Sequence, residues 1–166
     1  MLWEFDSPRP DKIITFYYRT LKESRLAVLG EFRVGAWVHA ESPTAGELDR
    51  LAHELKLDRG LLTDALDPFE VPRVEHDEGV VYVFTRVPQT DDDETTTVPL
   101  LVAIGEQFVL TVSSQRPQLL EKFFSGKIDV YTTQKIKLLL QILFELMHSY
   151  QLSLTAINRR VRSTSV

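Results

Sequence analysis

The chain lacks cysteine altogether among its 166 residues. Disulfide bonds, thiolate metal ligands and cysteine nucleophiles are therefore excluded, and a reducing compartment is compatible with the composition. The seven glycines never form the G-x-x-x-x-G-K-S/T or G-x-G-x-x-G patterns of nucleotide-phosphate sites. The G-x-S-x-G and H-E-x-x-H patterns of hydrolases and zinc peptidases are absent too. We therefore do not expect an enzyme.

Long apolar runs and clusters of basic residues are also missing. The most apolar window, residues 136–147, is interrupted by Lys137, Gln141 and Glu145, whereas a membrane-spanning helix needs about 20 mostly apolar residues. The first residues lack the basic and apolar segments of a secretory signal. The formal net charge of −5 disfavours a nucleic-acid partner, because phosphate binding needs clustered lysine and arginine. We expect the chain as given neither to be exported nor to cross a membrane.

Length and composition suit one compact domain with one appended element, since 43% of the residues are hydrophobic. Runs of β-branched and aromatic residues predict strands at 12–20, 26–28 paired with 31–34, 35–39, 80–87, 98–104 and 108–113. The strand at 80–87 is apolar enough to be central. The polar turn 89–97 would join it to 98–104 as an antiparallel hairpin with a solvated acidic tip at 91–94.

Local signals predict helices between the strands. Thr44 and Glu47 form a capping box ahead of a leucine stripe, and Asp58 can cap the helix that follows. A further helix is predicted at 118–124, where Gly126 ends it.

The segment 61–75, LLTDALDPFEVPRVE, is the most informative part of the chain. Asp64 and Asp67 lie three residues apart, so they share one face of a predicted helix whose other face can be buried. Pro68 ends this helix, and Pro72 favours the extended conformation of the next strand. The pattern thus predicts a carboxylate at a fixed position beside a sharp turn. An exposed polar helix face is the alternative interpretation.

From Thr132 onward, apolar residues recur at spacings of four and three, at Ile136, Leu140, Leu143, Met147, Tyr150, Leu154, Ile157 and Val161. This heptad seam predicts a long helix that packs on the domain at its start and on other helices further along. Core packing within one domain is the alternative use of the seam. No glycine or proline ends the pattern before Val166, so we expect the seam to continue beyond that residue.

Several motifs, in this order, make the chain resemble the cytosolic domain of the CorA family of divalent-metal transporters: Trp37-Val38, Ser42-Pro43-Thr44, the helix 48–57, Leu61-Leu62-Thr63-Asp64-Ala65-Leu66 and Pro72-Arg73-Val74-Glu75. The resemblance continues to the long helix, which would be the start of a stalk. We therefore predict an α/β fold with a mixed, largely antiparallel sheet flanked by helices. Residues 1–128 would form this domain, and residues 129–166 the first part of the stalk helix.

The resemblance implies that the full-length protein is a homopentamer with metal sites between neighbouring cytosolic domains, which bias a pore between closed and open. Asp64 stands at the position of a metal-sensing ligand, and Asp67 is the weaker candidate. Mg²⁺ would be regulatory and transported, with Co²⁺ or Zn²⁺ possible. The chain would be a soluble part on the cytoplasmic side, reaching the membrane only through a transmembrane region beyond Val166.

The chain also departs from the metal-sensing members of this family. They carry acids where this chain has Thr63 and Phe144, so the resemblance carries over only one sensor site, whose partner acid would lie beyond Val166. Glu145 would replace Phe144 only if the helix were rotated by about 100° or the alignment shifted by one residue. The alternative functions are a soluble module that binds helices without an ion, and a domain of a zinc-transporting relative.

Overall fold

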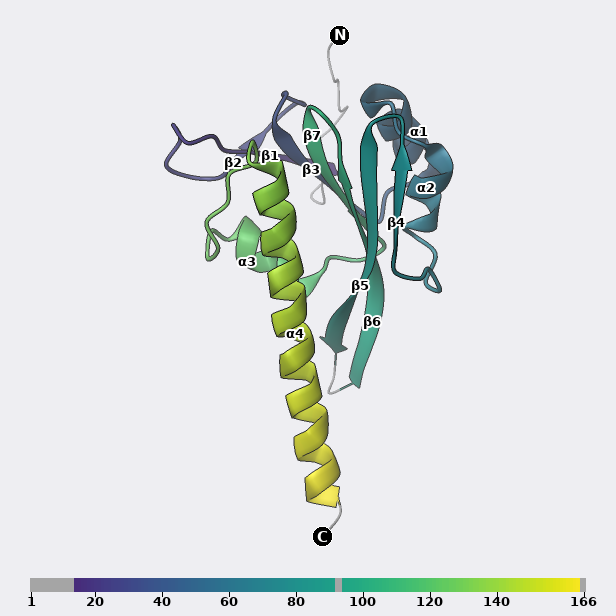
Figure 1. Cartoon of the computed structure of the whole chain (residues 1–166), viewed down its shortest axis with the longest axis vertical. Helices are drawn as coiled ribbons and strands as arrows, with labels where there is room; N and C mark the ends of the chain where they lie inside the picture. The colour runs from purple at the N-terminus through teal and green to yellow at the C-terminus, as the bar shows by residue number, and fades with distance from the viewer. Residues whose placement is uncertain (1–13, 92–93, 165–166) are drawn as a thin grey trace.

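The computed structural model describes residues 14–91 and 94–164. Its strands are β1 (Ile14–Tyr18), β2 (Ala27–Leu29), β3 (Ala36–Glu41), β4 (Arg73–Asp77), β5 (Val80–Asp91), β6 (Glu94–Ile104) and β7 (Phe108–Ser113). They form one sheet in the order β2-β1-β3-β7-β6-β5-β4 (Figure 1). β3 and β7 run parallel, and the other neighbours are antiparallel. The predicted fold class is thereby confirmed.

Helices cover both faces of this sheet. On one face lie α1 (Ala45–Leu55) and α2 (Arg59–Asp64); on the other lie η1 (Gln118–Leu120), α3 (Glu121–Phe124) and the first half of α4 (Lys135–Thr164) (Figure 1). Side chains alternate between the faces along each strand, so Val38 packs under α1 and α2 while its neighbour Trp37 packs under α3. Two hydrophobic cores result, one on each face of the sheet.

The helix ends follow from local chemistry. Glu47 N donates to Thr44 Oγ1 at 3.3 Å and Thr44 N donates to Glu47 Oε2 at 2.8 Å, which confirms the capping box. Lys56 adopts a left-handed conformation that ends α1. Asp58 Oδ1 then accepts from Leu61 N at 2.8 Å and starts α2. Gly126 has a positive φ of 75° just after α3, where the sequence predicted an end.

The capping box gives a test of this local account. Thr44→Ala leaves the amide of Glu47 without its acceptor, so we expect the free energy of unfolding to fall by about 1 kcal/mol. Urea unfolding followed by circular dichroism measures the change. Thr44→Ser keeps the hydroxyl and should keep most of the stability; an equal loss in both variants would show that the cap does not contribute.

Three details of strand pairing differ from the prediction. Residues 31–34 form no strand with 26–28; β2 instead pairs with β1, whose edge opposite β3 offers unpaired backbone groups. β5 lies second from the sheet edge and β7 is central, because β5 is fully buried on one face only along most of its length. β5 and β6 stay paired as far as Asp91 and Glu94, beyond the strand ends predicted at 87 and 98. Residues 12–13 of the first predicted strand and 92–93 of the acidic tip lie outside the described residues.

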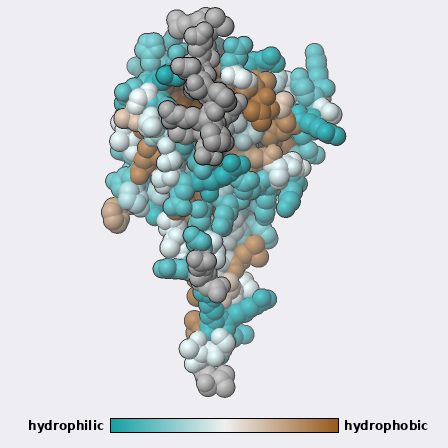
Figure 2. Space-filling model, turned by 180° about the vertical axis from the view of Figure 1, so that it is seen from behind, coloured by the Kyte–Doolittle hydropathy of each residue, from teal (hydrophilic) through white to brown (hydrophobic). Residues whose placement is uncertain are grey.

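α4 carries two different apolar stripes. Leu138, Ile142 and Leu146 are buried against the sheet, which confirms that the start of the long helix packs on the domain. Within the predicted seam, Leu143 and Tyr150 are partly buried, whereas most members are exposed: Ile136, Leu140, Met147, Leu154, Ile157 and Val161. Hydrophobic side chains remain visible among hydrophilic ones on the narrow lower part of the molecule (Figure 2). Whether the seam packs on other helices stays a prediction, as does the domain boundary at 128.

Among residues 14–91 and 94–164, no helix combines the length and the apolar character that crossing a bilayer requires.

Candidate functional site

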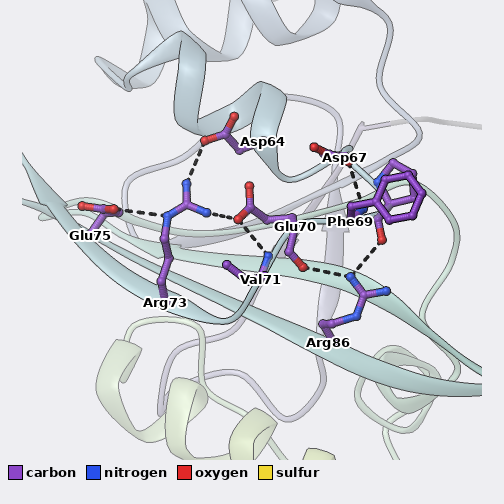
Figure 3. Close-up of polar contacts among 9 residues, drawn as sticks. Asp64, Asp67, Phe69, Glu70, Val71, Arg73, Glu75 and Arg86 are labelled. Atoms are coloured by element: carbon purple, nitrogen blue, oxygen red, sulfur yellow. Dashed lines mark hydrogen bonds and ion pairs between the residues drawn. The ribbon is translucent and has the colours of Figure 1, made fainter.

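Asp64 is the last residue of α2, directly above strand β4. Its Oδ2 atom accepts a hydrogen bond from Arg73 Nη2 at 2.7 Å (Figure 3). The side chain of Asp64 is 44% exposed, so the carboxylate is paired within its own protomer and still open to solvent. α2 fixes this position because Leu62 and Ala65 are fully buried on either side of Asp64 in the sequence.

Arg73, the first residue of β4, gathers three carboxylates around one guanidinium. Besides Asp64 it contacts Glu70, and its Nε donates to Glu75 Oε1 at 3.2 Å (Figure 3). The guanidinium also lies 4.0 Å from the ring centroid of Phe84. Burial lowers the pKa of Arg73, but the hydrogen bond to Asp64 and the charges of its partners outweigh burial and raise the pKa overall. The cluster therefore keeps a net charge of about −2, from three carboxylates and one guanidinium.

Asp67 does not share a helix face with Asp64, which corrects the prediction. α2 ends at Asp64, and Leu66 N and Asp67 N donate to Thr63 O and Asp64 O in tight turns, each at 3.0 Å. In a longer helix, residue 68 would donate its N–H to Asp64 O, but proline has no N–H and its ring clashes with that carbonyl, so the helix ends at Asp64. Asp67 Oδ1 instead accepts from Phe69 N at 2.9 Å, so this carboxylate stabilises the turn.

An exposed apolar patch adjoins this acidic cluster. We call it the Phe69 patch; it consists of Phe69, which is 85% exposed, and Val71, both on the segment between α2 and β4 (Figure 3). Val74 is exposed as well, but it belongs to the opposite face of the sheet, where it pairs with Val83.

The two departures from the family pattern can now be placed. Thr63 Oγ1 donates to Arg59 O at 2.9 Å, so its hydroxyl serves the helix. Phe144 is 65% exposed on α4. Glu145 faces the domain instead, is 22% exposed, and accepts from Lys122 Nζ at 2.8 Å. Glu145 is therefore not oriented to take the outward position that Phe144 occupies.

The donor atoms at Asp64 suit a hard cation, since carboxylate oxygens are the ligands that Mg²⁺ and Ca²⁺ prefer. Over the described ranges, however, no group of three or more histidine, cysteine or acidic residues is arranged to hold an ion. The acids at the site surround a guanidinium instead. An ion at Asp64 would thus draw its other ligands from water or from a second protomer.

Sequence reasoning placed Asp64 and missed its partners. The sequence carried a signal only for the ion pairs that Arg73 makes with Glu70 and Glu75, because these three residues alternate in charge within six positions. Residues i and i+2 of a strand share a face, so Arg73 and Glu75 lie next to each other on the same face of β4.

An α/β domain of this topology followed by a long helix is also found in solved structures of a metal-ion transporter. The soluble domain of CorA from Methanocaldococcus jannaschii matches with a TM-score of 0.74 at 25% identity, over 91% of this chain and 62% of that chain. The complete CorA magnesium transporter of the same organism matches with a TM-score of 0.76 at 25% identity, over 92% of this chain and 50% of that one.

A model of the family described as CorA-like Mg²⁺ transporter protein matches residues 33–165. The chain therefore belongs to this family, which confirms the resemblance found in the sequence. The cytoplasmic domain of ZntB from Vibrio parahaemolyticus shares the fold, with a TM-score of 0.71 at 10% identity over 90% of this chain and 63% of that chain. Among curated proteins, no sequence matches the chain. The chain spans half the length of the complete CorA structure it matches.

Proposed function

We propose that the chain is the cytosolic regulatory domain of a CorA-type channel or transporter for Mg²⁺, and that Asp64 is a metal-sensing ligand between protomers. In the full-length protein, five copies would surround a pore, with this domain on the cytoplasmic side of the membrane. The observation that carries the proposal is the half-exposed carboxylate of Asp64 at the end of α2, in a chain that belongs to a metal-transporter family.

The electrostatics of the cluster support a metal-dependent contact. The acidic cluster of one protomer, with its net charge of about −2, would repel an acid of the neighbouring protomer that faces it, and a hydrated Mg²⁺ between them would offset this repulsion. Loss of the ion would let the protomers separate, so metal would favour the closed state of the pore. Arg73 competes with the ion for Asp64, because both bind the same carboxylate. This competition keeps the affinity for the ion low.

The surfaces that such an assembly would cover are exposed in one copy. The Phe69 patch adjoins Asp64, and the outer stripe of α4 presents Leu140, Phe144 and Met147 to solvent. Burying these side chains between protomers would contribute apolar area to the contact. The same exposed stripe also fits a module that binds helices without an ion, which is the second candidate function.

The chemistry of the site favours one ion. Asp64 and its neighbours offer carboxylate oxygens, the chain has no cysteine, and within the described residues the ion pairs of Asp64 and Arg73 are with each other and with glutamates, not with a histidine that zinc commonly takes. Mg²⁺ is therefore the first choice, with Co²⁺ or Zn²⁺ as the other ions to test.

Titration with MgCl₂ tests the site in the 166-residue chain. We expect weak binding, seen as shifts of the amide NMR signals around Asp64, because one protomer leaves the ion mostly hydrated. Asp64→Asn keeps the shape and an acceptor for Arg73 but removes the charge, so these shifts should disappear. Asp67→Asn is the matched control on the same segment and should keep them.

Two results would contradict this proposal. NaCl at the same ionic strength could reproduce the shifts, which would mean that they report screening alone. Calorimetry could instead show tight one-to-one binding that survives Asp64→Ala, which would place the ion elsewhere. Helix binding that is insensitive to Mg²⁺ would favour the second candidate function.

A further inference from the structure

Arg86 on β5 holds the segment between α2 and β4 by its backbone. Its Nη1 atom donates to Pro68 O and to Glu70 O, both at 2.9 Å (Figure 3). The other two donors bind β6, with Nη2 to Thr97 O at 2.8 Å and Nε to Thr97 Oγ1 at 2.9 Å. One planar side chain thus fixes the 68–70 backbone to the β5–β6 hairpin, a geometry that lysine cannot reproduce.

The main chain of Arg86 is bound from the other side of the sheet. Tyr150 on α4 donates its hydroxyl to Arg86 O at 2.8 Å. Burial raises the pKa of Tyr150 above its usual value, while the charge of Arg86 opposes the change, so the hydroxyl keeps the proton it donates. Tyr150 is also the last residue of α4 that packs on the hydrophobic core. It therefore marks the place where the helix leaves the domain.

These contacts form a continuous path through the domain. Asp64 binds Arg73, Arg73 binds the side chain of Glu70, and the carbonyl of Glu70 binds Arg86, whose own carbonyl binds Tyr150. Each step is a hydrogen bond or ion pair between groups that are at least half-buried or held by a second partner. A displacement of the 68–70 backbone must therefore stretch bonds to β5 and, through β5, to α4.

We propose that Arg86 and Tyr150 are positioning residues that couple the segment between α2 and β4 to the point where α4 leaves the domain. The coupling itself needs no metal. Its use as a route from an ion at Asp64 to the stalk rests on the proposed function. The coupling is measured without divalent ions, and the effect of an ion at Asp64 is measured separately.

Hydrogen exchange in the intact chain without divalent ions is the test. Tyr150→Phe removes one hydroxyl from α4, and we expect the amides of Phe69, Glu70 and Val71 to exchange about fivefold faster, as for loss of one hydrogen bond. Arg86→Lys should have at least the same effect on these amides. By reciprocity, Glu70→Gln should speed exchange in α4 around Tyr150.

The control is Tyr131→Phe, which removes a hydroxyl that takes no part in this path and should leave these amides unchanged. Amides of α1 report global stability. Faster exchange at α1 and at 68–71 to the same extent would reduce Tyr150 to a merely structural role and overturn the proposal. So would an effect of Tyr150→Phe confined to α4.

A second arm adds MgCl₂. If Asp64 binds the ion, exchange around Tyr150 should slow in the wild-type chain and change less in Tyr150→Phe. An absent response to Mg²⁺ together with an intact effect of Tyr150→Phe at 68–71 would overturn the sensing role while confirming the coupling. A response to Mg²⁺ that is equal in both chains would show that metal acts by another route.

Discussion

Acidification from pH 6.5 toward pH 3 is expected to destabilise the chain through His39. This side chain is 3% exposed in the middle of β3, and its Nδ1 lies 2.8 Å from Thr111 Oγ1. Its Nε2 has no hydrogen-bond partner within the part of the chain that the structure describes. Burial, and to a smaller extent the charge of Arg116, lowers the pKa of His39 from 6.5 to about 3. The folded domain therefore needs the neutral imidazole.

The sign of the effect follows from proton binding. Between pH 6.5 and about 3, the unfolded chain binds a proton at His39 and the folded chain does not. The contribution of neutral His39 to the stability of the folded chain is fully present above pH 6.5 and is lost as the pH falls toward 3. The free energy of unfolding should drop by up to about 1.4 kcal/mol per pH unit from this residue alone. Urea unfolding at a series of pH values measures the slope.

A pair of variants isolates this histidine from the carboxylates that titrate in the same range. His39→Gln cannot take up the proton, so its slope between pH 6.5 and 4 should be shallower than that of the wild type by about one proton. His53→Gln changes an exposed histidine on α1 and should keep the wild-type slope. Equal slopes in the wild-type chain and His39→Gln would mean that His39 is protonated in the folded state.

The two stripes of α4 are expected to respond differently to alanine. Ile142 is fully buried between α4 and the sheet, so Ile142→Ala leaves a cavity and should lower the free energy of unfolding by about 2–5 kcal/mol. Phe144 lies two residues further on the same helix and points to solvent. Phe144→Ala should change the stability by less than about 0.5 kcal/mol, because little packing is lost.

Chemical unfolding of the two variants under identical conditions gives the comparison. Sedimentation velocity at increasing protein concentration adds a second measurement, in which Phe144→Ala should weaken any association of the chain while Ile142→Ala should act on folding. A loss of several kcal/mol in Phe144→Ala without a change in association would show that Phe144 packs inside its own domain, contrary to the structure.

Much of the local structure could be predicted because single residues decide it. Thr44, Asp58 and Gly126 each fix a helix end through their own backbone or side-chain chemistry, and the structure confirms all three. The polar turn also predicted the antiparallel pairing of β5 with β6, but pairing between strands without such a local turn depends on which surfaces are buried together, and no short pattern contains that information. The partner of β2 and the place of β5 in the sheet were wrong for this reason.

At the candidate site, too, local features could be predicted from the sequence and long-range contacts could not. The sequence predicts Asp64 on a helix that Pro68 ends; Asp64 does lie on α2, but α2 ends at Asp64 itself, three residues before Asp67. Its role toward a metal stays a prediction. The ion pair with Arg73 needs β4 to fold back beneath α2, and the bond from Tyr150 to Arg86 joins residues 64 positions apart. Contacts of this range are set by the tertiary fold and were not visible in the sequence.

The parallel pairing of β3 with β7 has a consequence for biosynthesis. β3 is apolar on both faces, and its second neighbour is made only after α1, α2 and three further strands. On the ribosome, the growing chain therefore exposes a strand edge with unpaired backbone groups, which is prone to aggregate with other nascent chains, until Ser113 has emerged. The β5–β6 hairpin is local and forms early, so the middle of the sheet closes last.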